Sequence, residues 1–304
     1  MKVLVIAGSE KDLPEAVGAS KDLGELYIAA YGGAANILEE AAKGAKAAYR
    51  VKGEAPEEIA AALETVYDKV SPNLVVTVTS KNAKDVFSRL AAKKSIPFIV
   101  DALEFTVSES TITVKRGILS GRAVAALELP LPAIVSIPPR KFKPATLEGA
   151  APQVEEVEPQ LQPKVKIVER KEKEKGGVNL EEAEIIVSVG RGFKKKEDLK
   201  LAFELAELLG AQIGCSRPIA ADLQWLGEEH WVGLSGKKVA PKLYMAIGIS
   251  GAPQHIAGIL DSKIVVAVNK DKSAPIFKNA DYGVVADLYQ FLPVLIEKIK
   301  ARKK

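Results

Sequence analysis

Short β-branched apolar runs alternate with longer stretches of helical periodicity along most of this 304-residue chain. The runs are continuously apolar, which is typical of strands that are buried on both faces of a parallel sheet. Amphipathic stretches between them predict helices that cover those faces. The pattern therefore predicts an α/β protein with two domains, each a mostly parallel sheet with helices on both faces. The expected strands are 3–6, 25–29, 74–78, 98–100, 184–189, 211–214, 243–249, 263–268 and 282–286.

Two changes in residue composition along the sequence divide the chain. Residues 106–135 are rich in threonine and valine and contain turn residues, which predicts a strand meander that closes the first domain. Prolines then recur from 138 onward and a charge run follows, as in a linker, although residues 165–168 could add a strand. A length of 304 residues also favours two domains. We expect an N-terminal α/β domain over 1–150, a linker over 151–180 and a second domain over 181–304.

Composition argues against several classes of partner and site. A formal net charge of +4 is small for this length, so neither nucleic acid nor an anionic membrane is expected as a partner. Cys215 is the single cysteine, which excludes an intramolecular disulfide and a multi-cysteine zinc site. The two histidines, His230 and His255, lack helical pairing, so no metal site is expected. With no membrane-length apolar run and no signal-peptide pattern, we expect a cytoplasmic protein without direct membrane insertion.

Polar, charged or glycine-flanked residues follow every expected strand of the second domain. Ligands of open parallel sheets bind outside the carboxyl ends of the strands. Five such ends predict a long ligand that lies across the crevice. The segments are 190–192, 215–218, 250–255, 269–271 and Asp287.

The turn over 250–255 is the most specific of these segments. Two small residues precede Pro253 at an expected first helical turn, where free backbone N–H groups favour a phosphate. Gly251 would let the phosphate approach the backbone closely. An ordinary tight turn between a strand and a helix is an equal alternative. Asp287 likewise has two interpretations: it binds ribose hydroxyls, or it caps the helix expected from Leu288.

Arg191 and Arg217 place two guanidinium groups at strand ends, where a planar fork suits phosphate and stacks on aromatic rings. Surface solvation is the alternative for each. Cys215 beside a strand is interpreted as an inert buried thiol. Trp225 and Trp231 are interpreted as core or interface anchors.

Eight short blocks in the second half agree in order and spacing with a known family. They are Gly-Arg-Gly at 190–192, Gly-Cys-Ser-Arg at 214–217, Gly-Leu-Ser-Gly-Lys at 233–237, Val-Ala-Pro-Lys-Leu-Tyr at 239–244, Gly-Ile-Ser-Gly-Ala-Pro-Gln-His at 248–255, Val-Asn-Lys-Asp at 268–271, Ala-Pro-Ile-Phe at 274–277 and Ala-Asp-Tyr-Gly at 280–283. This half resembles the C-terminal domain of electron-transfer flavoprotein α subunits of the archaeal and bacterial type. The first half resembles the family's N-terminal domain more weakly, mainly through 116–121 and the order of strands.

The resemblance implies a Rossmann-like domain that binds FAD in an extended pose, with a β subunit completing the particle through contacts to the N-terminal domain. It assigns the pyrophosphate and ribityl region to Arg191, Ser250, Gly251, Ala252, Pro253, Gln254 and Asn269. It assigns the adenosine end to Asp287 and Leu288. It surrounds the isoalloxazine ring with Ser216, Arg217, Val232, Gly233, Leu234, Ser235 and His255.

Reduced flavin carries negative charge near N1 and the C2 carbonyl, which a guanidinium and an imidazole would stabilise. By resemblance, Arg217 and His255 therefore tune the flavin potential, and Ser235 bonds near N5. Two departures stand out. Family members usually have Gln-Thr where this chain has Leu234-Ser235, and isoleucine where it has Pro253. Either change could shift the potential without removing FAD binding.

The resemblance implies a redox carrier rather than an enzyme that converts a substrate. In this hypothesis the chain takes electrons from dehydrogenases and passes them to a quinone- or ferredoxin-linked acceptor. An alternative is a subunit of a flavin-based bifurcating complex that oxidises NADH, in which the β subunit holds a second flavin. A nicotinamide-dependent oxidoreductase would typically need a glycine-rich fingerprint that the sequence lacks. A scaffold that has lost its ligand would not be expected to keep the two arginines, the 250–255 block, Asn269 and Asp287.

Overall fold

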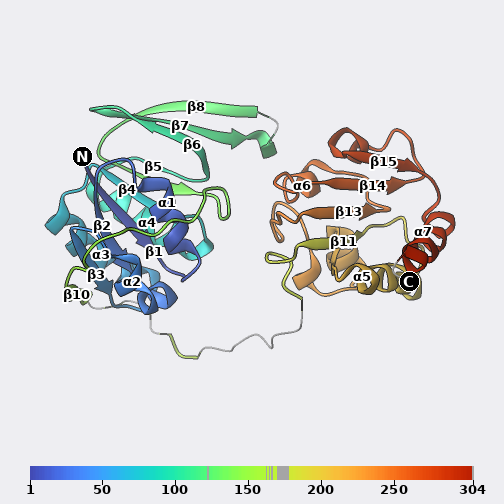
Figure 1. Cartoon of the computed structure of the whole chain (residues 1–304), viewed down its shortest axis with the longest axis horizontal. Helices are drawn as coiled ribbons and strands as arrows, with labels where there is room; N and C mark the ends of the chain where they lie inside the picture. The colour runs from blue at the N-terminus through green and yellow to red at the C-terminus, as the bar shows by residue number, and fades with distance from the viewer. Residues whose placement is uncertain (122, 162, 164, 166, 170–177, 303–304) are drawn as a thin grey trace. The chain divides into compact units, whose positions relative to one another are not determined.

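The computed structural model describes residues 1–121, 123–161, 163, 165, 167–169 and 178–302. The chain divides into two compact units, Met1–Lys171 and Glu172–Lys304 (Figure 1). The division falls inside the 151–180 range expected as a linker. Among the described residues, no helix has both the length and the apolar character that crossing a bilayer requires.

Seven described strands of the first unit form a fully parallel sheet, as the continuous apolar runs predict. They are β1 (Lys2–Ala7), β2 (Glu25–Ala30), β3 (Ala47–Val51), β4 (Leu74–Val78), β5 (Phe98–Ile99), β9 (Ala133–Ile137) and β10 (Val154–Val157). The order across the sheet is β10-β3-β2-β1-β4-β9-β5. All six residues of β1 except Lys2 are buried, because helices cover both faces.

Each face of this sheet has its own apolar core. On one face, α1 (Asp12–Ser20) and α2 (Leu38–Ala41) bury residues such as Leu13 and Leu38. On the other face, α3 (Pro56–Val70) and α4 (Lys81–Lys94) bury residues such as Leu63 and Phe87. Ser80 caps α4, since its side chain accepts a hydrogen bond from the Ala83 N–H at 3.0 Å. The first unit is therefore a three-layer α/β domain.

The meander predicted over 106–135 is an antiparallel sheet of three strands, but its boundaries differ. The strands are β6 (Ala102–Val107), β7 (Thr111–Ile118) and β8 (Ala123–Pro130). β9 is instead an inner strand of the parallel sheet, between β4 and β5. The burial patterns explain the difference: β8 alternates between more and less buried residues, whereas all five residues of β9 are buried.

Two further differences concern short segments. The alanine-rich stretch over 34–47, which lies between expected strands and so belongs to the stretches predicted as helices, contains the end of a 3-10 turn (Gly32–Asn36), α2 and the start of β3. The strand within the predicted linker is β10, which pairs with β3. Of residues 165–168, the described members 165, 167 and 168 are not in a strand.

The second unit contains five described strands in a fully parallel sheet, in the order β12-β11-β13-β14-β15. Their bounds are β11 (Ile185–Val189), β12 (Gln212–Cys215), β13 (Leu243–Ile247), β14 (Val265–Asn269) and β15 (Tyr282–Val285). Helices α5 (Lys200–Leu209) and α7 (Leu288–Arg302) pack on one face, and the short helix α6 (Pro253–Ile256) packs on the other. The strand order reverses between β11 and β13, and doubly wound sheets bind ligands at such a switch point.

Glu15 ties α1 to the segment that follows β9. The residue is 4% exposed. Its carboxylate accepts backbone N–H groups from Arg140 and Lys141, each at 2.7 Å, and from Phe142 at 3.0 Å. These bonds compensate the burial of the charge, because a buried carboxylate without donors is costly.

We expect Glu15→Gln to lower the free energy of unfolding of the first unit by about 2 kcal/mol, since an amide N–H₂ would face backbone N–H groups. Urea unfolding followed by circular dichroism measures the loss. Glu25→Gln, at an exposed position, is the control. Both tryptophans lie in the second unit, so their fluorescence transition should not move. An equal effect of the two substitutions would contradict this account.

Candidate cofactor-binding site

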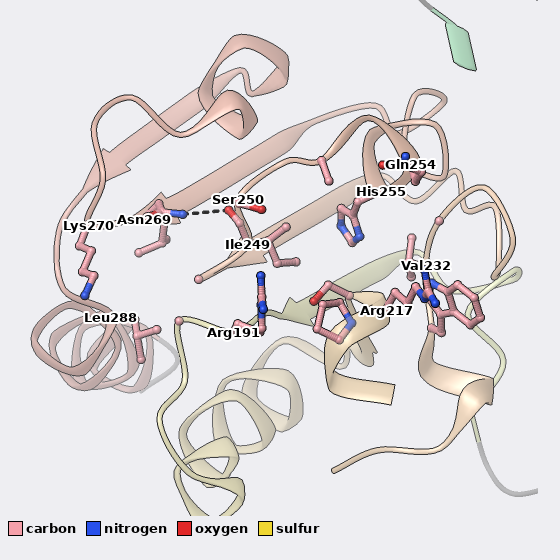
Figure 2. A pocket seen from close by; sticks show the side chains of 18 of the residues that line it. Arg191, Arg217, Val232, Ile249, Ser250, Gln254, His255, Asn269, Lys270 and Leu288 are labelled. Atoms are coloured by element: carbon pink, nitrogen blue, oxygen red, sulfur yellow. Dashed lines mark hydrogen bonds between the residues drawn. The ribbon is translucent and has the colours of Figure 1, made fainter. Parts of the chain in front are cut away.

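A cavity of about 800 Å³ lies at the carboxyl ends of β11, β12, β13 and β14 (Figure 2). Small-molecule and cofactor sites span roughly 300–1,000 Å³. In Figure 2 the side chains of Arg217, Val232 and His255 gather at one end, and Asn269, Lys270 and Leu288 lie at the other. Arg191 lies between the two groups. The cavity is therefore elongated across the strand ends, as the predicted long ligand requires.

Close backbone contact between the loops after β11 and β13 forms the floor at the switch point. The Gly192 N–H donates to the Gly248 carbonyl at 3.0 Å. Gly248 has a φ of +65°, and a Cβ at this position would lie 2.8 Å from the Gly192 Cα. A side chain on Gly192 would likewise lie 2.6 Å from the Gly248 Cα. Glycine is thus required at both positions.

The turn after β13 is held by Asn269 at the end of β14. Its Nδ2 donates to the Ile249 carbonyl at 2.9 Å, and its Oδ1 accepts the Asp271 N–H at 2.9 Å. Pro253 is the first residue of α6, as expected. Gly251 has a φ of +84°, and a Cβ there would lie 2.3 Å from the Ile276 nitrogen. Packing on Ile276 therefore requires glycine at 251, and a close approach of a phosphate to this residue stays a prediction.

The loop over 231–236 forms the wall at the Arg217 end. The Leu234 N–H donates to the Gln254 carbonyl at 2.7 Å, and the Val232 N–H donates to the Cys215 carbonyl at 2.9 Å. These bonds tie the loop to α6 and to β12. The side chain of Leu234 is 45% exposed, so it is not fixed by the core.

Asp287 and Tyr289 build the opposite end from the start of α7. The Asp287 Oδ1 accepts the Tyr289 N–H at 2.8 Å, so this carboxylate caps the helix, which was one of its two interpretations. The Tyr289 hydroxyl accepts the Lys194 N–H at 2.7 Å and donates to Asp198 at 2.6 Å. Tyr289 thereby fastens the loop after β11 to α7.

The charges of the cavity lining favour an anion. Among the described residues that line the cavity, Arg191, Lys194, Arg217 and Lys270 contribute four cations, against the single carboxylate of Asp287. Arg191 and Arg217 are both exposed, and both line the cavity. Their exposure therefore does not decide between surface solvation and anion binding, because the exposed side chains lie at the cavity. Such a donor set suits a diphosphate.

Burial shifts the pKa values of two ionisable groups in the core beside this wall. It lowers the pKa of His255 to about 4, opposed by the Val232 backbone. The imidazole is therefore neutral at neutral pH. Burial raises the pKa of the Cys215 thiol to about 12, which fits the interpretation of an inert thiol.

Most residues assigned from the sequence come together in this cavity. Its lining includes Arg191, Ser216, Arg217, Val232, Gly233, Leu234, Ser235, Ser250, Ala252, Gln254, His255, Asn269, Asp287 and Leu288. Gly251 and Pro253 are not among the lining residues. Their common location does not test which part of a ligand each contacts, and those assignments stay predictions.

Gly192, Pro218 and Lys270 line the cavity and fall in strand-end segments from which a ligand was predicted, although no role was assigned to them. Sequence reasoning missed the other lining residues, which are Lys194, Ala221, Trp231, Gly248, Ile249, Val268, Ala286 and Tyr289. Most adjoin a predicted residue, so widening each strand-end segment by one or two positions would have found them. Lys194 belongs to a lysine run that also suits a solvated helix start. Trp231 lines the cavity while its ring packs against the core, so the interpretation as an anchor describes only part of its environment.

Fold and site together define an α/β protein that binds an elongated, anionic cofactor at a switch point. Residues 12–161 match the electron transfer flavoprotein domain family, and residues 179–260 match the electron transfer flavoprotein FAD-binding domain family. Asn269, Lys270 and Asp287 lie beyond the second match, so their place in the site comes from the structure.

Curated relatives extend the similarity over most of the chain. The electron transfer flavoprotein subunit alpha of Bacillus subtilis strain 168 is 38% identical over 238 residues, 77% of this chain and 73% of the relative. Its counterpart from Syntrophomonas wolfei is 38% identical over 250 residues, 79% and 76% of the two chains. Protein FixB of Escherichia coli O139:H28 is 34% identical over 237 residues, 77% and 75% of the two. The chain belongs to the family of electron transfer flavoprotein α subunits.

The match to an FAD-binding domain makes FAD the cofactor of this site. Observations on the chain itself fit that molecule. The cavity is elongated and cationic, as a dinucleotide diphosphate requires. At one end, the buried His255 Nδ1 has no hydrogen-bond partner among the described residues, so the wall retains a polar atom for a ligand.

The two glycines at 248 and 210 offer a matched test of the floor. Both have φ near +65°, but a Cβ on Gly210 meets no described heavy atom within 4 Å. Alanine at either position costs about 1–2 kcal/mol for the left-handed conformation. We expect Gly248→Ala to cost about 1–3 kcal/mol more, from overpacking against Gly192. Urea unfolding followed by tryptophan fluorescence measures both, and equal losses would refute the close contact.

The neutral His255 predicts a pH dependence of stability. Above its ordinary pKa of 6.5, the imidazole is neutral in both the folded and the unfolded chain. Between about pH 6.5 and 4, only the unfolded chain binds the proton, so the free energy of unfolding falls as the pH falls. The total loss is about 3 kcal/mol.

Tryptophan-detected urea unfolding at several pH values measures this loss. His255→Gln should remove that part of the slope, whereas His230→Gln, the matched control, should keep it. A slope that is the same in His255→Gln and the parent chain would show that the imidazole is not excluded from protonation.

Proposed function

We propose that this chain binds FAD and carries electrons as the α subunit of a particle that a β subunit completes. Family membership supports the electron-transfer role, and the elongated cationic cavity supports FAD as its carrier. In this proposal, dehydrogenases donate the electrons and a quinone- or ferredoxin-linked protein accepts them. A cytoplasmic location stays a prediction. The observation that carries the proposal is the convergence of Arg191, Arg217, His255, Asn269 and Asp287 on one cavity.

Bound FAD supplies the redox chemistry, because its ring system accepts and releases electrons. The side chains of this chain bind and orient it. Arg191 and Lys270 offer cations to the diphosphate, and Asn269 holds the 250–255 turn against it. Asp287 offers carboxylate oxygen to the adenosine end while it caps α7.

At the other end, Arg217 and His255 set the electrostatics of the flavin. Arg217 is a permanent cation, so it favours a flavin that has gained negative charge. His255 is neutral and provides a hydrogen bond rather than a charge. Ser235 offers a hydroxyl, and its neighbour Leu234 shields this end from water with an exposed apolar side chain. The proposal thus contains no residue that breaks a substrate bond.

The first unit would supply the contact to the β subunit. Its antiparallel sheet ends at a turn with exposed apolar residues: Ile118 is 39%, Leu119 72% and Val124 60% exposed. Adjacent exposed apolar side chains are typical of protein contacts. We expect Leu119→Asp to weaken assembly with the β subunit and to leave FAD binding by assembled particles unchanged.

Co-expression with a candidate β subunit tests the proposal. We expect a yellow particle with one FAD on this chain, released by denaturation and quantified by absorbance. A second flavin in the particle would instead favour the bifurcating alternative. A particle that stays colourless after reconstitution with FAD would refute the proposal.

Arg217→Ala tests the electrostatic role. We expect the particle to retain FAD, because the other three lining cations remain, and the flavin midpoint potential to fall by tens of millivolts, since about 1.4 kcal/mol corresponds to 30 mV for two electrons. Potentiometric titration measures it. Arg217→Lys keeps the charge and should shift the potential less. A potential that does not change in Arg217→Ala would contradict this role.

A further inference from the structure

Tyr244 is a fully buried tyrosine beneath the cavity wall that sequence reasoning did not single out. It lies on β13 and is 0% exposed, and it is not among the residues that line the cavity. Its hydroxyl lies 2.9 Å from His255 Nε2. The two rings are 6.0 Å apart at an angle of 55°. A buried hydroxyl is costly without a hydrogen bond, so this contact accounts for a polar atom deep in the core.

Ser188 on β11 adds a second buried hydroxyl next to the first. Ile186 is opposite Tyr244 in the register, so Ser188 lies two residues further along the same face of the sheet. It is 0% exposed, and its Oγ makes no hydrogen bond to a described residue. The apolar residues of this core include Ile186, Val232, Ala246, Ile249 and Ile256. Among these groups, the hydrogen-bond contact that reaches the cavity wall is the one between Tyr244 and His255.

The contact between Tyr244 and His255 allows two arrangements of the protons. Burial raises the pKa of Tyr244 and lowers that of His255 to about 4, so both groups are neutral and each carries one proton to donate. In the first arrangement, Tyr244 donates to Nε2 and the imidazole proton lies on Nδ1. In the second, Nε2–H donates to the Tyr244 oxygen and Nδ1 keeps a lone pair.

The chemistry of the two groups separates the two arrangements. A phenol hydroxyl is a stronger hydrogen-bond donor than a neutral imidazole N–H, and an imidazole lone pair is a stronger acceptor than a phenol oxygen. The first arrangement therefore makes the better use of the 2.9 Å contact. It puts an N–H on Nδ1, a buried atom that makes no hydrogen bond to a described residue and so stays available to a ligand of the cavity.

We propose that Tyr244 is a positioning residue for His255: its hydroxyl donates to Nε2 and thereby holds the imidazole in the Nδ1–H tautomer at the cavity wall. His255 lines the cavity and Tyr244 does not, so Tyr244 acts on a ligand only through His255. The tautomer decides whether this wall presents a donor or an acceptor. A donor suits the negative charge of a reduced flavin. This link to the flavin is the part of the inference that rests on the proposed function.

Nitrogen NMR of the full-length chain, labelled at the histidine ring nitrogens, tests the tautomer without any flavin. Only two histidines are present, so His230→Gln assigns the signals. We expect the parent chain to carry its proton on Nδ1 of His255. We expect Tyr244→Phe, which keeps the ring and removes the hydroxyl, to change the tautomer ratio about fivefold to tenfold toward Nε2–H. Tyr282→Phe, at an exposed tyrosine, should leave the ratio unchanged.

The same variants in the particle with its β subunit link the tautomer to the cofactor. We expect Tyr244→Phe to keep FAD affinity within about threefold, because Tyr244 does not line the cavity, and to lower the flavin midpoint potential. A parent chain protonated on Nε2, or an unchanged ratio in Tyr244→Phe, would overturn the proposal. So would a shifted ratio with an unchanged potential. A parent particle that binds no FAD would instead refute the proposed function, and the tautomer measurement would still decide the role of Tyr244.

Discussion

The close contact between Gly192 and Gly248 is the constraint on which the second unit depends. At this point the strand order reverses, and the loops after β11 and β13 meet backbone to backbone. A side chain at either position would collide with the other loop, so the crevice floor exists only because both residues are glycine. The remaining walls are then built by hydrogen bonds from β12, β14 and α7. The cavity is a consequence of the topology, and its chemistry comes from residues placed at each strand end.

Two electrostatic conditions coexist in this cavity. Four cations make the lining attractive to a diphosphate, while the imidazole at one end is kept neutral by burial. A cation and a neutral donor act differently: the first attracts an anion by its charge, and the second depends on which ring nitrogen holds the proton. In the arrangement that we propose, the Tyr244 hydroxyl, 2.9 Å from Nε2, controls the position of that proton from inside the core.

Much of the fold could be predicted from the sequence, because buried parallel strands leave continuous apolar runs and polar residues follow at their carboxyl ends. The strands β1, β2, β4, β11, β13 and β14 were predictable on that basis to within two residues. β3 was not, since Ala47–Val51 follows an alanine-rich stretch whose helix is cut short by glycines at 32, 33 and 44. β9 was assigned to the wrong sheet because a run of threonine and valine does not reveal where a meander ends.

The residues of the site also fall into those that the sequence predicts and those that it does not. Arg191, Ser250, Asn269 and Asp287 lie at a strand end or a few residues beyond it, so they were predictable. Lys194 could not be separated from its lysine neighbours, because its position depends on the Tyr289 hydroxyl, 95 residues away. In the sequence, Tyr244 has the pattern of an ordinary core aromatic residue. Only the structure places its hydroxyl beside His255.

A crystal structure of the FAD-loaded particle tests the central claim most directly. The account predicts an extended FAD across the ends of β11, β13 and β14, with its ring between Arg217 and His255, its diphosphate at Arg191 and Lys270, and its adenosine at Asp287. An FAD bound to the first unit, or one with its ring at Asp287, would contradict it.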